Sequence, residues 1–401
     1  MSRSNDAGRF FQTSDALATS ERKAAKSKNK FGNPINLPSK LLNVAADPTN
    51  GSAVLTAEAA GVISSVNLDS SKVTKIITSP DAPLTSVAVS SSGDSKSVFA
   101  GCWDKNVYSK PLASSSRAKT ATLPTTNGGH TDFVKCLLAT SLNGKPILIS
   151  GGSDASIIVW KQSNDTFAPL HKLKGHTKSL QDLAVDPLSL PSGSTEPTES
   201  LVLFTASSDR EIRRWYISLG KAYELPESLE SPILVHETSV YKLHFDSDGD
   251  LWTASADKTA KHLVRTRDWE ADTTLRHPDF VRDVVVHEGL GLVVTACRDE
   301  EIRIWNTASS DLVCTYSGHY EEVTGLLLVG EGSKSVVSVS IDGTVRRWGL
   351  ERKEMQKYWD EVEREKAEND DGDGNQKQAG RSLLTAEEEA ELAELMDDDD
   401  T

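Results

Sequence analysis

The sequence contains no long apolar run. No stretch of its 401 residues approaches the roughly 18 uninterrupted apolar residues that a membrane-spanning helix needs. The N-terminus, MSRSNDAGRFFQTSD (1–15), also lacks the apolar core of about 7–15 residues that a secretory signal peptide carries. We therefore expect a protein that is kept in the cytoplasm or the nucleus.

Cysteine is also scarce. The chain has four cysteines, Cys102, Cys136, Cys297 and Cys314, which are widely spaced and form no CxxC pair. They are better interpreted as small apolar residues in a reducing compartment than as disulfides or zinc ligands. Neither a GxxxxGK[ST] loop nor a GxGxxG loop occurs, so nucleotide binding has no support. The sequence predicts no cofactor and no bound metal.

Charge is distributed unevenly along the chain, whose formal net charge is −15. Residues 1–40 carry eight Lys and Arg against three Asp and Glu, whereas residues 351–401 carry seven against nineteen. An acidic chain disfavours broad contact with nucleic acid phosphates, so nucleic acid is an unlikely partner. The basic run ERKAAKSKNK (21–30) is interpreted as a solvated tail, with a weak nuclear-import signal as the alternative.

What the chain does contain is a repeated motif. Possible turn positions recur at residues 60, 104, 154, 209, 257, 299 and 342, near the 40–45-residue spacing of four-stranded propeller blades. Each copy has the pattern of a strand, a tight turn and a strand, preceded by another apolar strand. The clearest copies are SGGSDASIIVW (150–160), TASSDREIRRW (205–215), TACRDEEIRIW (295–305) and SVSIDGTVRRW (338–348).

Seven such units predict an all-β, seven-bladed β-propeller, because radial closure leaves few strand edges exposed. The Ser- and Pro-rich segment 186–200 is interpreted as a loop insertion within one unit. The segment FGNPINL (31–37) is a candidate for the outer strand of the last blade, which would close the ring.

A histidine precedes five of the copies: His130, His176, His236, His277 and His319. Three of them follow glycine, in GGH (128–130), KGH (174–176) and SGH (317–319), and four copies end in Trp. In these features residues 35–350 resemble the WD-repeat family. The resemblance implies a hydrogen-bonded network of His, Ser or Thr, turn Asp and Trp inside each blade. The implied sets are His130–Ser150–Asp154–Trp160, His176–Thr205–Asp209–Trp215, His236–Thr253–Asp257 (with Leu263 in place of Trp), His277–Thr295–Asp299–Trp305 and His319–Ser338–Asp342–Trp348.

The same residue types could suggest a hydrolase triad or a metal site. A triad is one constellation in one pocket, whereas these sets recur at blade spacing in five places. The histidines also lie in different blades rather than at close ligand spacing such as HExxH. We therefore predict structural networks and no catalytic residues. None of the four repeat-ending tryptophans is followed by Asp, so the WDxR box of some cullin-ligase receptors is absent.

The resemblance further implies that partners bind the face that carries the turn between strands two and three. The residue before each turn Asp would face the ligand there. Trp103 and Arg298 are the favoured anchors, because aromatic residues and Arg dominate binding interfaces; packing of Trp103 beneath a loop is an equal alternative. Phe133 and Phe280 are interpreted as core residues, with a place on the same binding rim as the alternative. The full set of candidate partner-binding residues is Trp103, Ser153, Ser208, Arg298, Ile341 and Tyr320.

The two ends of the chain differ from the repeats in composition and in predicted structure. We expect a basic, flexible and disordered tail over 1–34, the propeller over 35–350, and a charged, partly helical and acidic tail over 351–401. Within the last, 351–370 is helix-like, 371–380 is a linker, and a capping-box pattern opens a short acidic helix at Thr385. A basic partner surface is the natural hypothesis for this acidic end.

These features favour a non-enzymatic scaffold or adaptor that binds partner proteins or peptides on one propeller face. A ubiquitin-pathway adaptor is the alternative, because GHTDFVKCL (129–137) and TASADKTAK (253–261) resemble ubiquitin-binding propellers of the phospholipase-A2-activating-protein type. A propeller enzyme is the least favoured, because it would need a metal or carboxylate cluster at the central channel.

Overall fold

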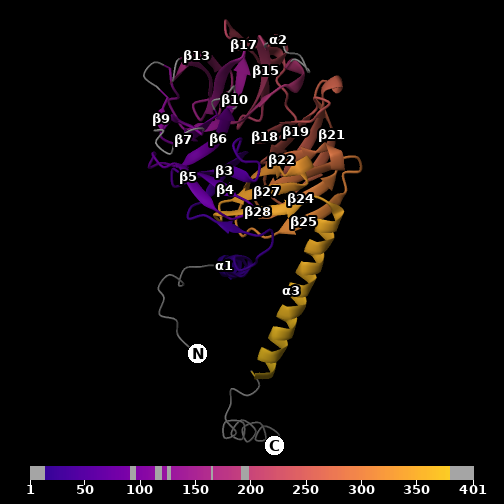
Figure 1. The fold of residues 1–401 in the computed structure, drawn as a ribbon. Coiled ribbons are helices and arrows are strands. Elements are labelled where there is room, and N and C mark those ends of the chain that lie inside the picture. The colour runs from indigo at the N-terminus through magenta and orange to yellow at the C-terminus, as the bar shows by residue number, and fades with distance from the viewer. Residues whose placement is uncertain are drawn as a thin grey trace, which may run out of the picture. The chain divides into compact units, whose positions relative to one another are not determined.

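The computed structural model describes residues 14–90, 96–112, 120–123, 128–163, 166–190 and 198–379. The chain divides into two compact units, residues 1–350 and 351–401. Within the described part of the first unit, seven four-stranded antiparallel sheets form the seven blades of a β-propeller, as the sequence predicts (Figure 1).

The strands of each blade are given from the innermost to the outermost. Blade one has β2 (Leu41–Ala46), β3 (Ala53–Glu58), β4 (Ile63–Asn67) and β5 (Val73–Ile77). Blade two has β6 (Leu84–Ser90), β7 (Ser97–Cys102), β8 (Val107–Pro111) and β9 (Ala121–Thr122). Blade three has β10 (Val134–Leu142), β11 (Lys145–Gly152), β12 (Ser156–Ser163) and β13 (Thr166–Lys174). Blade four has β14 (Leu180–Val185), β15 (Ser200–Ser207), β16 (Ile212–Ser218) and β17 (Ala222–Glu224).

The remaining blades follow the same order. Blade five has β18 (Val240–Phe245), β19 (Leu251–Ser255), β20 (Thr259–Val264) and β21 (Glu270–Arg276). Blade six has β22 (Val281–His287), β23 (Leu292–Cys297), β24 (Glu301–Asn306) and β25 (Leu312–Ser317). Blade seven has β26 (Val323–Val329), β27 (Ser335–Ser340), β28 (Thr344–Gly349) and β1 (Ile35–Asn36). The α-helices are α1 (Ser14–Lys26), α2 (Pro226–Glu230) and α3 (Arg352–Ala379), and the 3-10 turns are η2 (Pro187–Ser189), η3 (Arg265–Arg267), η4 (Glu288–Leu290) and η5 (Glu331–Ser333).

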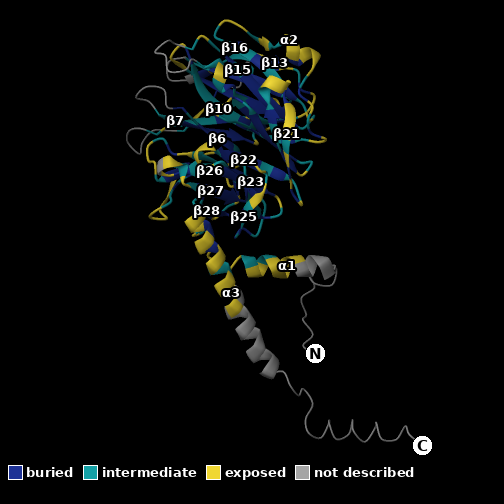
Figure 2. Ribbon diagram, turned by 90° about the vertical axis from the view of Figure 1, so that its right-hand side faces the viewer, coloured by how far each residue is buried: buried dark blue, intermediate teal, exposed yellow. Residues whose placement is uncertain are grey.

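The hydrophobic core lies between neighbouring blades rather than in one central mass. β3, β7, β23 and β27 are buried along almost their whole length, because apolar side chains on both faces pack against the adjacent sheets (Figure 2). One cluster, for example, joins Cys136 and Ile149 of blade three to Leu183 and Trp215 of blade four. All four cysteines are buried and form no disulfide, as expected for small core residues.

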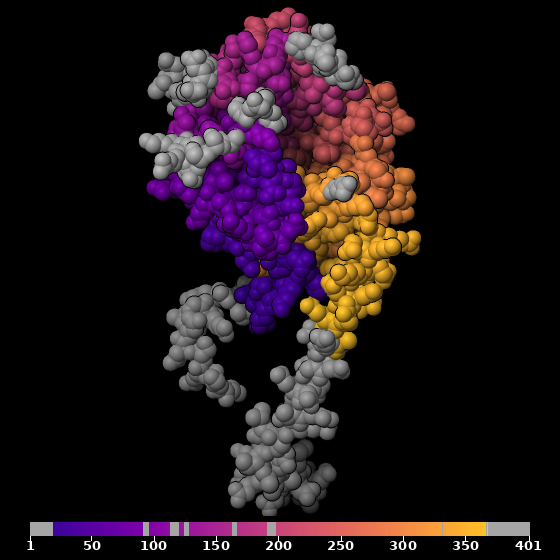
Figure 3. Space-filling model, in the orientation of Figure 1, coloured from indigo at the N-terminus to yellow at the C-terminus, as the bar shows by residue number. Residues whose placement is uncertain are grey.

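The ring closes through the N-terminal segment, as the sequence suggested. β1 pairs with β28, with Ile35 opposite Val345 and Asn36 opposite Thr344. The Leu37 amide then donates to the Gly343 carbonyl at 2.8 Å. The innermost strands of blades one and seven, β2 and β26, also contact each other. In Figure 3 the indigo surface of the first blade accordingly lies beside the orange surface of the last.

The basic segment before β1 differs from the flexible tail that we expected. Residues 14–26 form helix α1, and its basic side chains bind acidic residues of blade six and of the loop that enters blade seven. The described residues of α1, from Thr19 onward, include no buried side chain, so these ion pairs are its evident attachment. The pairs are Arg22–Glu300 at 2.8 Å, Lys26–Glu300 at 3.1 Å, Lys26–Glu301 at 2.7 Å and Lys23–Glu321 at 2.7 Å.

The second unit contains α3, which includes the helix expected over 351–370. The helix continues through Ala379, so the segment 371–380 that we interpreted as a linker is largely helical. No proline interrupts this stretch, and Gln and Lys near its end are good helix formers. The capping-box pattern at Thr385 lies outside the described residues. Among the described helices, none has the length and apolar character needed to cross a bilayer.

The closure predicts unequal effects of two glycine substitutions. Gly343 has φ +80°, and an added Cβ would lie 2.9 Å from the Leu37 carbonyl oxygen. Gly144 has φ +69° but open space around it. Each Gly→Ala change forces a left-handed residue, at about 1–2 kcal/mol; Gly343→Ala must also push the closing strand away. We expect Gly343→Ala to lower the free energy of unfolding, measured with denaturant, clearly more than Gly144→Ala. Equal losses of unfolding free energy in the two variants would contradict the closure of the ring through the N-terminal strand.

Candidate functional site

The structure brings together the predicted network in blades three, four and seven. In blade three, His130 Nδ1 lies 2.9 Å from Asp154 Oδ1 and its Nε2 lies 2.7 Å from Ser150 Oγ. The Trp160 indole N–H then donates to Ser150 Oγ at 2.8 Å. Blades four and seven repeat this arrangement through His176–Asp209 at 2.9 Å, His176–Thr205 at 2.7 Å, Trp215–Thr205 at 2.9 Å, His319–Asp342 at 2.8 Å, His319–Ser338 at 2.7 Å and Trp348–Ser338 at 2.9 Å.

The proton positions in this network follow from its chemistry. An ionised carboxylate only accepts, so the imidazole nitrogen that faces Asp154 carries a proton and donates it to this hydrogen bond. Burial by itself raises the pKa of Asp154. The hydrogen bonds from His130, from the Thr131 amide and from Ser156 outweigh burial and hold the pKa of Asp154 well below its usual range. The network is therefore a satisfied charge in the protein interior rather than a reactive group.

Blade five keeps the network without its tryptophan. His236 Nδ1 lies 2.8 Å from Asp257 Oδ2, and its Nε2 lies 2.7 Å from Thr253 Oγ1. Leu263, which stands where the other blades have Trp, is fully buried in the core between blades four and five. An apolar residue of this size therefore fills the position, although it adds no hydrogen bond.

Blade six does not form the predicted network, so our assignment of Asp299 was wrong. His277 contacts Thr295 at 2.8 Å and the Leu275 carbonyl at 3.3 Å, while the Asp299 carboxylate accepts two hydrogen bonds from Arg303, at 2.6 and 3.1 Å. Trp305 still donates to Thr295 at 2.9 Å.

The equivalent arginine in blade four explains the difference. Arg213 lies opposite Thr205, as Arg303 lies opposite Thr295, but it binds Glu211 at 2.6 Å and Glu224 at 2.9 Å. In blade six the counterpart of Glu211 is Glu301, which is already held by Lys26 of α1 at 2.7 Å and by Ser317 at 3.0 Å. Blade six also lacks a counterpart of Glu224, because Leu312 stands opposite Trp305. Arg303 pairs with Asp299 instead, and His277 has no carboxylate hydrogen-bond partner.

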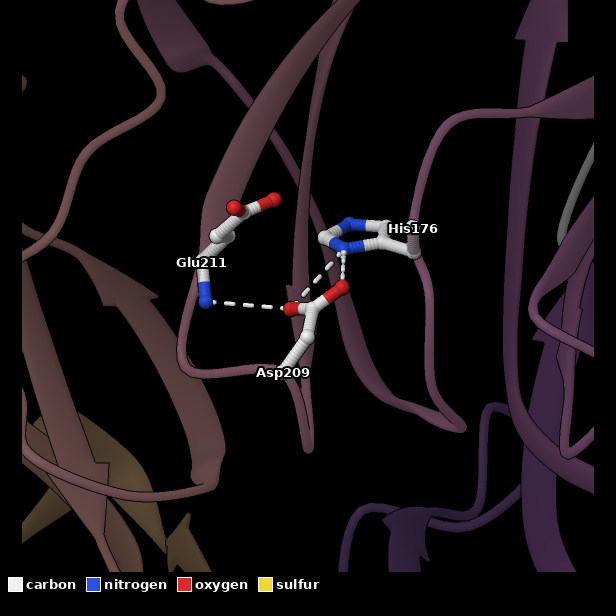
Figure 4. Close-up of side chains that lie close together, drawn as sticks. All are labelled: His176, Asp209 and Glu211. Atoms are coloured by element: carbon white, nitrogen blue, oxygen red, sulfur yellow. Dashed lines mark hydrogen bonds and ion pairs between the residues drawn. The ribbon is translucent and has the colours of Figure 1, made fainter.

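A cluster of His176, Asp209 and Glu211 has donor atoms close enough to one another to hold a metal ion. Figure 4 shows that the Glu211 backbone amide, not its carboxylate, reaches Asp209. Both nitrogens of His176 already have hydrogen-bond partners, Asp209 and Thr205, and the Glu211 carboxylate pairs with Arg213. These interactions account for every member of the cluster as part of the blade.

The candidate partner-binding residues lie on the face that carries the β-turns between the second and third strands, although their exposure differs. Trp103 is 42% exposed, and its ring stacks on that of Phe133 with centroids 5.1 Å apart and 11° between planes. Phe133 is 37% exposed, so its interpretation as a core residue was wrong. Arg298 is exposed, and its guanidinium lies over the Phe280 ring at 5.1 Å.

The other candidates are half-buried and have local roles. The Ser153 hydroxyl accepts a hydrogen bond from Ser179 at 3.2 Å, and the Ser208 hydroxyl accepts one from Gln181 at 2.7 Å. The Tyr320 hydroxyl donates to the Asp342 carbonyl at 3.1 Å. Ile341 is half-buried.

The same face opens into a cavity of about 400 Å³ at the propeller axis. Trp103 is the one predicted residue in its lining. The other residues at the mouth of this cavity were not predicted. Each is the second residue of an innermost strand, so one recurs in every blade. Around the ring they are Leu42, Thr85, Lys135, Gln181, Tyr241, Arg282 and Thr324.

Comparisons with known proteins agree with this architecture. A family model described as WD domain, G-beta repeat, matches residues 121–161 and 310–349. An uncharacterized WD repeat-containing protein of Schizosaccharomyces pombe is 33% identical over 405 residues, which cover 98% of this chain and 99% of that protein. Pre-mRNA-processing factor 19 of Bos taurus is 27% identical over 183 residues, which cover 45% of this chain and 32% of that protein. The crystal structure of the WD40 beta propeller domain of Doa1 matches with a TM-score of 0.61 and 20% identity, covering 81% of this chain and 97% of that one.

The altered network of blade six predicts a pH effect on stability. Burial, followed by the positive charge of Arg303, lowers the pKa of His277 to about 4, against about 6.5 for an unfolded histidine. Between these values the unfolded chain binds a proton that the folded protein does not. The stability from this group is thus complete above about pH 6.5 and is lost as the pH falls toward 4, by at most about 1.4 kcal/mol per pH unit.

His277→Gln should remove this part of the pH dependence, because Gln can still bond to Thr295 but does not titrate. The measurement is the free energy of unfolding at several pH values, with His287→Gln, at a half-buried histidine that caps the 3-10 turn η4, as the control. If the slope of the free energy of unfolding against pH is the same in His277→Gln as in the wild type, His277 is not the source of this pH dependence.

Proposed function

The chain belongs to the WD-repeat family, and from this premise we propose that it is a non-enzymatic scaffold that binds partner proteins or peptides over the mouth of its central channel. The observation that carries the proposal is the stacked pair of Trp103 and Phe133, two large aromatic side chains exposed side by side. Trp is among the residues that contribute most to binding energy at protein interfaces.

The surrounding structure supports a rigid binding face. The His130–Asp154 bond fixes the loop from which Phe133 projects, and the Trp103 amide donates to the Pro83 carbonyl at 3.0 Å. A preformed surface loses little conformational freedom when a ligand binds. Arg298, held over Phe280, extends this face toward blade six.

The proposal assigns no catalytic step to the chain. In blades three, four, five and seven the His, Asp and Ser or Thr groups that could serve as acid, base or nucleophile are bonded to one another, and in blade six Asp299 is paired with Arg303. The buried cysteines support a reducing compartment, so we place the protein in the cytoplasm or the nucleus. The ubiquitin-pathway alternative gains no specific support, because a 20% identical propeller shows the fold alone.

Affinity capture from native extract tests the proposal, with the full-length wild type compared with Trp103→Ala/Arg298→Glu. We expect a defined set of proteins to be lost by about tenfold or more, because truncation of an interface anchor costs about 2 kcal/mol. The melting temperature should not change, since both side chains project from the surface.

The matched control is Leu312→Ala/Arg267→Glu. Both residues are exposed: Arg267 lies in the connection between the third and fourth strands of blade five, and Leu312 begins the fourth strand of blade six. These connections lie at the opposite end of the blades, because successive connections of a meander alternate ends. This variant should keep every partner. Retention of all partners by the first variant would instead move the binding site off the proposed face.

A further inference from the structure

The central channel is lined by more cationic than acidic side chains. Three cationic residues, Lys135, Lys242 and Arg282, line the cavity together with two acidic residues, Asp182 and Asp283. The cations therefore exceed the acids by one within the lining, although the whole chain has a net charge of −15.

Both carboxylates already form hydrogen bonds within the propeller. Asp182 accepts a hydrogen bond from the Leu243 amide of the next blade at 2.9 Å and lies 3.3 Å from Lys242 Nζ. Asp283 accepts from the Leu326 amide of the next blade and from the Val284 amide, both at 2.8 Å. The bonds to the Leu243 and Leu326 amides tie neighbouring blades together, so the two acids have structural roles.

Arg282 is also engaged. Its Nε lies 2.7 Å from Glu322 Oε1, and its guanidinium lies 4.3 Å from the centroid of the Tyr241 ring. The arginine is thus held in place at the mouth of the channel between an acidic and an aromatic residue.

Lys135 differs from these groups. Within the described part of the chain, its ammonium has neither a hydrogen bond nor an ion pair, although the side chain is half-buried. Burial, followed by the positive charge of Arg282, lowers the pKa of Lys135. Withdrawing a cation from water beside a second cation costs free energy unless an anion pairs with it.

The aromatic pair adjoins this unpaired cation. Lys135 follows Phe133 by two residues, and Phe133 stacks on Trp103, which lines the same cavity. An apolar surface and a positive charge therefore meet at one point of the channel mouth. A ligand that suits both would carry an anionic side chain next to an apolar one.

We propose that the channel mouth binds an acidic segment of a partner protein, whose anionic side chain pairs with Lys135 while a neighbouring apolar side chain packs on Trp103 and Phe133. This inference rests on the proposed function and adds the chemistry of the ligand. Aspartate, glutamate and phosphoserine each carry the required negative charge.

The test is an array of short random-sequence peptides, each made in an acidic version, a phosphoserine version and a neutral version with Asn, Gln or Ser at the same position. The full-length wild type, Lys135→Met, Trp103→Ala and the control Lys145→Met are applied to it. Lys145 is an exposed lysine at the opposite end of blade three, so its variant removes one charge away from the channel.

We expect the wild type and Lys145→Met to bind acidic or phosphoserine versions about tenfold more tightly than neutral ones. Lys135→Met should lose this preference while keeping its melting temperature and its weaker binding to the neutral versions. The two anionic versions then tell whether a carboxylate or a phosphate is preferred.

Two results would overturn the inference about the acidic ligand and leave the proposed function standing. One is equal binding of neutral and anionic versions by the wild type, and the other is an unchanged anionic preference in Lys135→Met. Peptides that bind equally well to wild type and Trp103→Ala, or no bound peptide at all, would contradict the proposed function as well.

Discussion

The hydrogen bond between a buried histidine and the aspartate of a β-turn, which forms in blades three, four, five and seven, is the interaction on which the candidate binding face depends. The histidine lies in the loop that leads into the innermost strand, and the aspartate lies between the second and third strands. One bond thus fixes two connections at the same end of the blade. Ser or Thr and Trp extend it into the core, where each member would be costly to leave unpaired.

The fixed loops in turn position the candidate binding face. Phe133 and Lys135 follow His130 by three and five residues. The His130–Asp154 bond therefore fixes the backbone from which both side chains project. The interior network and the exposed aromatic and cationic groups therefore have separate roles: the network sets the geometry of the face, and the exposed groups provide its chemistry.

Much of the fold could be predicted from the sequence because its signals are local. Turn residues, alternating apolar strands and the spacing from His to Asp all lie within one blade, and they predicted the networks of blades three, four, five and seven. The exception, Asp299, depends partly on a contact from far away: Lys26 of α1 holds Glu301. Blade six also has Leu312 where blade four has Glu224, and Arg303 pairs with Asp299. The channel mouth escaped prediction for the same reason, since Lys135 and Arg282 become neighbours only when the ring closes.

A photo-reactive amino acid placed at Gln181, which lines the channel mouth, tests the central claim most directly. The same group at Ser309, in the exposed connection between β24 and β25, reports on the opposite end of the blades. After irradiation in native extract, our account predicts specific cross-linked partners from position 181 and none of those partners from position 309. Partners that cross-link from position 309 but not from position 181 would contradict it.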